Sequence, residues 1–244
     1  CTNADCTSKV VTTVDSSGNI GQYTSLALGA DTFARISYYD VSNHDLKLAR
    51  CTNADCTTKI ITTIESAGDV GKFTALALGA DGFARIGYFD ETKDDLKFVH
   101  CTNADCTTKN ITTVDATGDS GRNTSLVLGA DGFARISYVY TTNFDLKFAR
   151  CTNVDCTTKT TTDVDTTTAV EEISSVAIGP DGLARVSYDD DGNDDLKFVR
   201  CLDETCSAAQ QQADVGQSFR PTVSSPLMRL DLYLKKVKIL YQIC

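Results

Sequence analysis

Eleven cysteines are the residues of this 244-residue chain whose spacing most directly suggests chemistry. Ten of them form five pairs with the spacing C-x4-C: Cys1/Cys6, Cys51/Cys56, Cys101/Cys106, Cys151/Cys156 and Cys201/Cys206. A redox-catalytic pair is normally C-x-x-C and does not recur along a chain. Zinc sites need a second pair or histidines nearby, and neither His44 nor His100 stands at a ligand spacing. The pattern favours disulfides and an oxidising compartment, so we expect an extracellular or cell-surface protein.

Each disulfide should bracket a short turn at the end of a hairpin, where the Cβ atoms come close enough to be bridged. A loop this short contributes only about 2 kcal/mol in the chain-entropy account. Cys244 is the odd cysteine, and it competes with Cys1 for Cys6. Cys1 could carry a lipid, or it could simply be the first residue of a repeat. The interpretation as the first residue of a repeat is favoured.

Arginines recur at one position, as Arg35, Arg85, Arg135 and Arg185. They could form an anion-binding ring or the arginines of a sialidase site. They could also form structural ion pairs between blades, with Asp31 or Asp45 and their repeats. The second interpretation is favoured, because a buried arginine needs a carboxylate partner and both aspartates also recur.

Acidic residues outnumber basic ones by 33 to 23, which gives a net charge of −10. Nucleic-acid binding is excluded, because it needs a basic surface. No apolar run is long enough for a transmembrane segment. The densest acidic stretch, residues 189–195, could bind calcium, but it lacks the EF-hand spacing and is interpreted as a solvated loop.

These residues belong to a repeat of 50 residues, since each C-x4-C pair opens the next copy. The repeats are 1–50, 51–100, 101–150 and 151–200, followed by a degenerate copy at 201–244. Within the first repeat, strand patterns occupy 9–15, 23–29, 34–40 and 45–51, separated by turns rich in Gly, Asn, Asp and Ser. The sequence therefore predicts one all-β domain over residues 1–244, a five-bladed β-propeller with four antiparallel strands in each blade.

The first strand pattern, Lys9–Asp15, corresponds to the outermost strand of a blade. We expect it to pair with residues near Lys238–Ile243 and so to close the ring within one chain, because an unpaired edge strand invites aggregation. Pairing between chains, which would build filaments, is the alternative.

The motifs ISYYD at 36–40 and DLKLA at 45–49 resemble the repeat of secreted bacterial β-propellers with ISYYD and DLK(Y/F)A signatures. The resemblance covers about 200 residues clearly and implies a secreted propeller, with no single activity attached. A five-bladed ring is also similar in architecture to tachylectin-type lectins, which is a likeness of fold alone.

A ligand site, if there is one, should lie where the second-to-third-strand turns share an edge with the loops that enter the next blade. Candidate ligand-binding residues there are Tyr23, Tyr39, Asp40, Asn43, Phe89 and Asp90. Turn-forming residues and half-buried core tyrosines are the competing interpretation, and it is the favoured one.

Near-identical repeats produce rings of equal residues, whereas catalysis needs one asymmetric constellation. No zinc, phosphate-loop or G-x-S-x-G motif is present, so we expect no enzyme, catalytic residue, metal or cofactor. The expected function is that of a structural or adhesive surface protein able to self-assemble. The alternative is a multivalent lectin with sites between blades, so the expected partners are the chain itself or cell-surface glycans.

Overall fold

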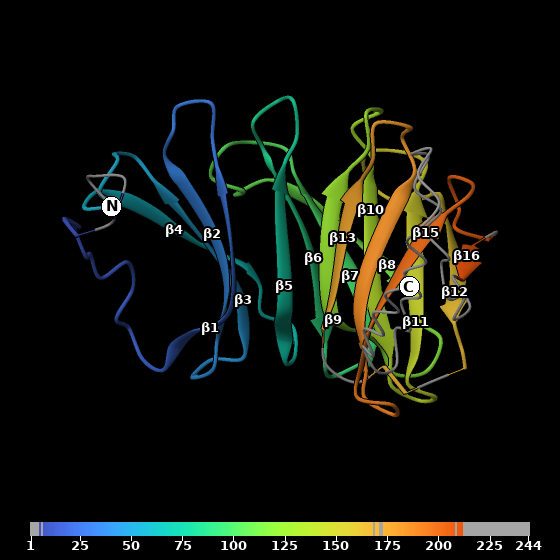
Figure 1. Ribbon diagram of the computed structural model, residues 1–244. Helices are drawn as coiled ribbons and strands as arrows, with labels where there is room; N and C mark the ends of the chain where they lie inside the picture. The colour runs from blue at the N-terminus through green and yellow to red at the C-terminus, as the bar shows by residue number, and fades with distance from the viewer. Residues whose placement is uncertain (1–4, 6, 168, 171–172, 208, 212–244) are drawn as a thin grey trace, which may run out of the picture. The chain divides into compact units, whose positions relative to one another are not determined.

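The computed structural model describes residues 5, 7–167, 169–170, 173–207 and 209–211. This part of the chain contains strands and no helix, and the strands form four sheets of four (Figure 1). The first sheet contains β1 (Ile20–Leu28), β2 (Ala34–Asp40), β3 (Asp45–Cys51) and β4 (Lys59–Glu65). The second contains β5 (Val70–Leu78), β6 (Ala84–Asp90), β7 (Asp95–Cys101) and β8 (Lys109–Asp115). The third contains β9 (Ser120–Leu128), β10 (Ala134–Tyr140), β11 (Asp145–Cys151) and β12 (Lys159–Asp165). The fourth contains β13 (Ser174–Ile178), β14 (Ala184–Asp190), β15 (Asp195–Cys201) and β16 (Ala209–Gln211).

Each sheet is an antiparallel meander in which strands that follow one another in the chain are paired. Three strands come from one repeat, and the fourth comes from the start of the next repeat. The sequence-based predictions of an all-β fold built from four-stranded antiparallel units are confirmed, and the predicted strands 34–40 and 45–51 match β2 and β3. The architecture is a propeller-like repeat fold.

The N-terminal segment departs from the prediction, because residues 9–16 form no strand. Its counterparts β4, β8 and β12 each pair with a third strand of the sheet before them, and no described residue pairs with 9–15 in this way. Asp15 still occupies its expected place, since its Oδ2 accepts a hydrogen bond from the Tyr38 hydroxyl at 2.8 Å.

The fifth blade and the closure of the ring cannot be located within the described residues. The expected partner strand, Lys238–Ile243, lies outside them, as do Cys1, Cys6 and Cys244. The part of the chain that the structure describes therefore consists of four sheets.

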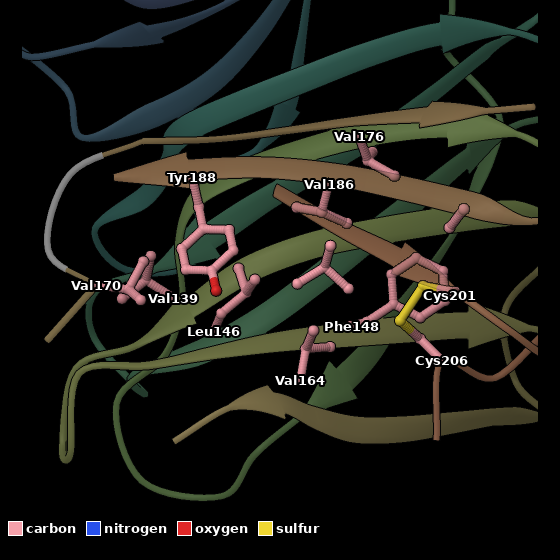
Figure 2. Close-up of a cluster of buried hydrophobic side chains, with 12 residues drawn as sticks. Val139, Leu146, Phe148, Val164, Val170, Val176, Val186, Tyr188, Cys201 and Cys206 are labelled. Atoms are coloured by element: carbon pink, nitrogen blue, oxygen red, sulfur yellow. A yellow bond between two sulfur atoms is a disulfide. The ribbon is translucent and has the colours of Figure 1, made fainter. Parts of the chain in front are cut away.

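The hydrophobic core lies between neighbouring sheets. Figure 2 shows the cluster between the third and fourth sheets, where Leu146 and Phe148 of β11 lie among Val186 and Tyr188 of β14. Equivalent clusters fill the seams between the first and second sheets and between the second and third. Burying a side chain of this size stabilises the fold by about 1.5–3 kcal/mol, so the stacking of sheets provides the main stabilisation.

Four disulfides close the hairpins that join third strands to fourth strands. They are Cys51–Cys56, Cys101–Cys106, Cys151–Cys156 and Cys201–Cys206, as the C-x4-C spacing predicts. The second cysteine of each pair has a positive φ of 51° to 57°, which turns the chain sharply enough to bring the two Cα atoms within 4.6–4.8 Å. Both cysteines of each pair are buried, and the last three disulfides belong to the apolar clusters between neighbouring sheets.

Each repeated arginine forms an ion pair with the aspartate four residues before it. The first three pairs, Arg35–Asp31, Arg85–Asp81 and Arg135–Asp131, are 2.7–2.8 Å long, and these arginine side chains are almost fully buried. The fourth, Arg185–Asp181, is 2.8 Å long and more exposed. Arginine and aspartate belong to the same hairpin, so the pair fixes the turn between the first and second strands and does not link two blades.

A second polar network crosses every seam. In the second sheet, Lys97 contacts both Glu65, at the end of the first sheet, and Asp90, and the Tyr88 hydroxyl also donates to Glu65. The first sheet repeats the pattern with Lys47, and the fourth repeats it with Lys197. In the third sheet Tyr140 replaces the second carboxylate, and Lys147 pairs with Asp115 at 2.8 Å.

Candidate functional site

The six residues expected to bind a ligand divide into exposed and buried groups. Tyr23 is 39% exposed, and Asn43 is also exposed. Tyr39, Asp40, Phe89 and Asp90 are at most 2% exposed. Asp40 caps its turn, because its carboxylate accepts hydrogen bonds from the backbone N–H groups of Ser42 and Asn43 and from the Asn43 side chain. Asp40 and Asp90 are thus turn-forming residues.

A bulge in the first strand of each of the first two sheets carries an aromatic residue, of which Tyr23 is exposed and Phe73 is half-buried. The β1–β2 register shifts between Gln22 and Ser25, and the β5–β6 register shifts between Lys72 and Ala75. Tyr23 and Phe73 lie at these bulges with φ of 51°, a left-handed conformation that costs an aromatic residue about 1–2 kcal/mol. The third repeat has Asn123 at the same position and the same φ, and asparagine tolerates this conformation well.

The aromatic rings of Tyr23 and Phe73 contact each other across the seam between the first and second sheets. Their centroids are 4.5 Å apart, and the interplanar angle is 49°. We call Tyr23 and Phe73 the aromatic clasp. Tyr39 lies behind Tyr23 at 6.1 Å, and Phe89 lies behind Phe73 at 6.3 Å. Phe73 was not among the residues expected to bind a ligand, although its alignment with Tyr23 one repeat earlier is the sequence signal that could have identified it.

A row of polar side chains begins beside the clasp. The Tyr39 hydroxyl lies 2.6 Å from Asp69 Oδ1 and 2.7 Å from His44 Nδ1. A hydroxyl has one proton, so donation to Asp69 requires His44 Nδ1 to donate to the Tyr39 oxygen. Neutral His44 then carries its proton on Nδ1 and leaves Nε2 as an acceptor on a side chain that is 57% exposed.

The row continues across the second sheet to the third. Lys72 pairs with Asp69 at 3.0 Å and with Glu91 at 3.4 Å. Arg122 then pairs with Glu91 at 3.4 Å and with Asp119 at 3.1 Å. We call these seven residues the polar row: Tyr39, His44, Asp69, Lys72, Glu91, Arg122 and Asp119.

Mutual contact fixes the protonation states along the polar row. Burial alone would raise the pKa of Asp69, but the hydrogen bond from Tyr39 and the ion pair with Lys72 outweigh it and hold this pKa below the ordinary value. Burial alone would lower the pKa of Lys72, but the hydrogen bonds and charges of Asp69 and Glu91 outweigh it and raise this pKa. Burial, and then hydrogen bonding to Asp69, raise the pKa of Tyr39. At neutral pH the row therefore presents an ionised Asp69, a protonated Lys72 and a neutral phenol that is a poor nucleophile.

The clasp and the row are not repeated around the fold. At the clasp position the first three repeats have Tyr23, Phe73 and Asn123, and at the position of His44 the later repeats have Asp94 and Phe144. The core positions, by contrast, keep their residue types, as Leu46, Leu96 and Leu146 illustrate. The described site is thus asymmetric, and the expectation of rings of equal residues is wrong for this edge of the sheets.

Among the residues that the structure describes, no three His, Cys, Asp or Glu side chains gather to hold a metal ion. The acidic residues 189–195 form the end of β14, a turn and the start of β15. No helix in the described ranges is long and apolar enough to cross a membrane. The four disulfides indicate an oxidising environment.

Comparison with known proteins yields likeness of fold only. No protein-family model matches the chain, and no curated protein matches its sequence. A protein of unknown function from Dyadobacter fermentans is similar, with a TM-score of 0.54 and 11% identity over 76% of this chain and 62% of its own length. A mutant of the NanB sialidase from Streptococcus pneumoniae has a TM-score of 0.48 and 14% identity, over 68% of this chain and 27% of its own. A bifunctional GH43-CE protein from Bacteroides eggerthii has a TM-score of 0.38 and 12% identity, over 74% and 30%. The chain thus spans less than two thirds of each of these proteins.

The expectation that the chain is not an enzyme is corrected: a sialidase and a GH43 protein are among the solved structures to which it is similar, although TM-scores of 0.48 and 0.38 carry no conclusion about its own activity. The premise of that expectation also fails, since the polar row is asymmetric. Identities of 11–14% show the fold alone, so these likenesses assign no catalytic activity.

Proposed function

We propose that this chain is a secreted, disulfide-stapled propeller that binds neutral glycans at the aromatic clasp. One observation carries the proposal: two aromatic residues are held in a strained backbone conformation beside a row of hydrogen-bonding groups. Strain of this kind persists only where the surrounding structure enforces it, and it concentrates at binding sites. The four disulfides support an extracellular or cell-surface location.

The chemistry of the site suits a sugar. A pyranose ring presents a face of C–H groups that can pack on an aromatic ring, while its hydroxyl groups donate and accept hydrogen bonds at the rim. Tyr23 and Phe73 provide the aromatic surface. Asp69 and Glu91 provide acceptors, and Lys72 provides a donor, with side chains that are 19–32% exposed and so accessible to a ligand.

The charges favour a neutral glycan over an acidic one. Every arginine in the described part of the chain is already paired with a carboxylate. Within the polar row, three carboxylates outnumber Lys72 and Arg122. An anionic sugar would meet net negative charge there and no unpaired guanidinium.

The double variant Tyr23→Asn/Phe73→Asn tests this function. Asparagine is the residue that the third repeat uses at this position, so the variant should fold. Relief of the strained φ should offset the lost ring packing, leaving the free energy of unfolding within about 1 kcal/mol of the wild type. Binding to neutral oligosaccharides on a glycan array should fall by about tenfold or more, since each lost stacking contact weakens binding by up to about 1.5 kcal/mol.

Asn123→Gly is the matched control, because it changes the same bulge where no aromatic ring is present, and its binding should equal that of the wild type. Wild-type protein that binds nothing on the array would overturn the proposed function. Undiminished binding by the double variant would place the glycan elsewhere, and a preference for sialylated glycans would overturn the neutral class.

A structural or adhesive role through self-assembly is a second candidate, and it rests on a different observation. Leu26 and Leu28 on β1 are 59% and 63% exposed, and Leu196 and Phe198 on β15 are 85% and 55% exposed. Their equivalents inside the stack are covered, as Leu96 at 0% illustrates. The exposed apolar side chains of β1 and β15 are of the kind that neighbouring sheets bury against each other elsewhere in the fold. Self-assembly would cover these two faces with other molecules. We propose as the competing explanation that the repeat 201–244 covers them as a fifth blade, with residues 9–15 as its outer strand, and so closes the ring within one chain.

The double variant Leu196→Glu/Phe198→Glu separates closure from self-assembly. Closure predicts a wild-type monomer by light scattering at all concentrations, and a variant whose melting temperature falls because charges enter a buried seam. Self-assembly predicts a wild-type mass that grows with concentration, and a variant that becomes monomeric without loss of melting temperature.

A further inference from the structure

The turn between β10 and β11 differs from its equivalents in the other sheets. Tyr140 stands where the other three repeats have an aspartate that closes the turn, as Asp40 does in the first. Phe144 stands where the first repeat has His44 and the second has Asp94. This turn alone among the four carries two aromatic residues, and no role in the core accounts for Phe144, which is 39% exposed.

Tyr140 is held in a fixed position. Lys147 Nζ lies 4.9 Å from the centre of its ring, within the range of a cation–π contact. On another side the ring packs against Gly118, whose φ is 56°. A Cβ atom on Gly118 would lie 2.8 Å from the Tyr140 hydroxyl oxygen, so the missing side chain provides space for the ring.

Phe144 is held in a conformation that phenylalanine does not favour. Its φ is 61°, and its carbonyl oxygen accepts a hydrogen bond from the backbone N–H of Val170, which fixes the turn against the segment between β12 and β13. His44, Asp94 and Asp194 adopt the same conformation at the equivalent positions. Asparagine, aspartate and histidine are the non-glycine residues that tolerate it best. The third repeat thus keeps a strained and exposed aromatic residue where a polar one would be easier to accommodate.

This turn is continuous with the polar row. Asp119, the last residue of the row, accepts a hydrogen bond at its backbone oxygen from the N–H of Thr141 at 2.9 Å. The N–H of Asp119 in turn donates to Thr142 Oγ1 at 3.1 Å. The row therefore runs from the aromatic clasp at the first seam to the turn that carries Tyr140 and Phe144.

We infer that Tyr140 and Phe144 form a second sugar-binding contact, and that the ligand is an extended neutral oligosaccharide lying along the polar row from the clasp to this turn. The inference rests on the proposed function and specifies its ligand. The turn lies two sheets from the first sheet, and packed sheets are about 10 Å apart, so the ligand spans about 20 Å. A single sugar cannot reach both ends, and a chain of several units can. Two linked contacts also raise the affinity of a long ligand above that of a short one.

The test is the variant Phe144→Asp, measured on an array that carries glucose, galactose, mannose and N-acetylglucosamine oligomers of increasing length. Aspartate occupies this position in the second and fourth repeats, so the turn should form. The wild type should bind the longer members of one series at least about tenfold more tightly than its shortest bound member. Phe144→Asp should remove this gain and leave binding of the short members unchanged. Asp194→Asn, at the same turn position in the fourth sheet, should change neither.

The outcomes separate the two proposals. If long and short oligomers bind the wild type equally, or if Phe144→Asp binds long oligomers as the wild type does, the second contact is wrong while the clasp stands. If Tyr23→Asn/Phe73→Asn also leaves binding intact, the proposed function fails at the clasp. If no oligomer of any length binds the wild type, both proposals are wrong.

Discussion

The free energy of unfolding should fall by about 3–5 kcal/mol when Lys97 is replaced by methionine, as expected when one partner of a buried charge network is removed. The Lys97 side chain is only 6% exposed, and Asp90 beside it is fully buried. Methionine fills nearly the same volume but leaves the carboxylates of Glu65 and Asp90 without their cation. Denaturant unfolding followed by circular dichroism measures the loss.

Lys147→Met is the matched control, because Tyr140 replaces the second buried carboxylate in that seam. Lys147 there pairs with the buried Asp115 at 2.8 Å and, at 3.8 Å, with Asp163, which is exposed to solvent. The loss of stability in Lys147→Met should be clearly smaller than that in Lys97→Met. If both variants lose the same amount of stability, the aliphatic part of the lysine side chain stabilises the seam, and neutralisation of the two carboxylates by the lysine charge does not.

Gly71→Ala should also destabilise the fold strongly, by about 3 kcal/mol in total. Gly71 has a φ of 103°, and a Cβ atom there would lie 2.7 Å from the Cα atom of Leu46 in the neighbouring sheet. Backbone strain at positive φ costs about 1–3 kcal/mol, and forcing two sheets apart adds about 1–3 kcal/mol. For a chain of this size the melting temperature should fall by about 10 °C, measurable by calorimetry.

Gly82→Ala separates the two contributions. Gly82 also has a positive φ, of 76°, but a Cβ atom there meets nothing within 4 Å. This variant should lose about 1–2 kcal/mol, the cost of the backbone conformation alone. A loss at Gly71 no larger than that at Gly82 would contradict the close approach of the first two sheets.

The sequence by itself determined the features that depend on short stretches of chain. The strands at 34–40 and 45–51 follow from β-branched and aromatic residues bounded by Gly and Asp turns, and the structure matches them residue for residue. The four hairpin disulfides follow from a spacing of five residues that only a tight turn can bridge. Repetition at intervals of 50 residues made each of these signals visible several times.

Only the tertiary structure decided what lies at the seams. The sequence of Lys9–Asp15 is typical of a strand, but the segment forms none. A strand requires a neighbouring strand to pair with, and local sequence does not determine whether one is present. Tyr39 and Phe89 look like ligand-binding residues but are buried, because the next sheet covers them. The aromatic clasp joins Tyr23 to Phe73, one full repeat later, and stacking of the sheets brings them together. Residues that far apart meet only once burial of apolar surface has fixed how one sheet lies on the next.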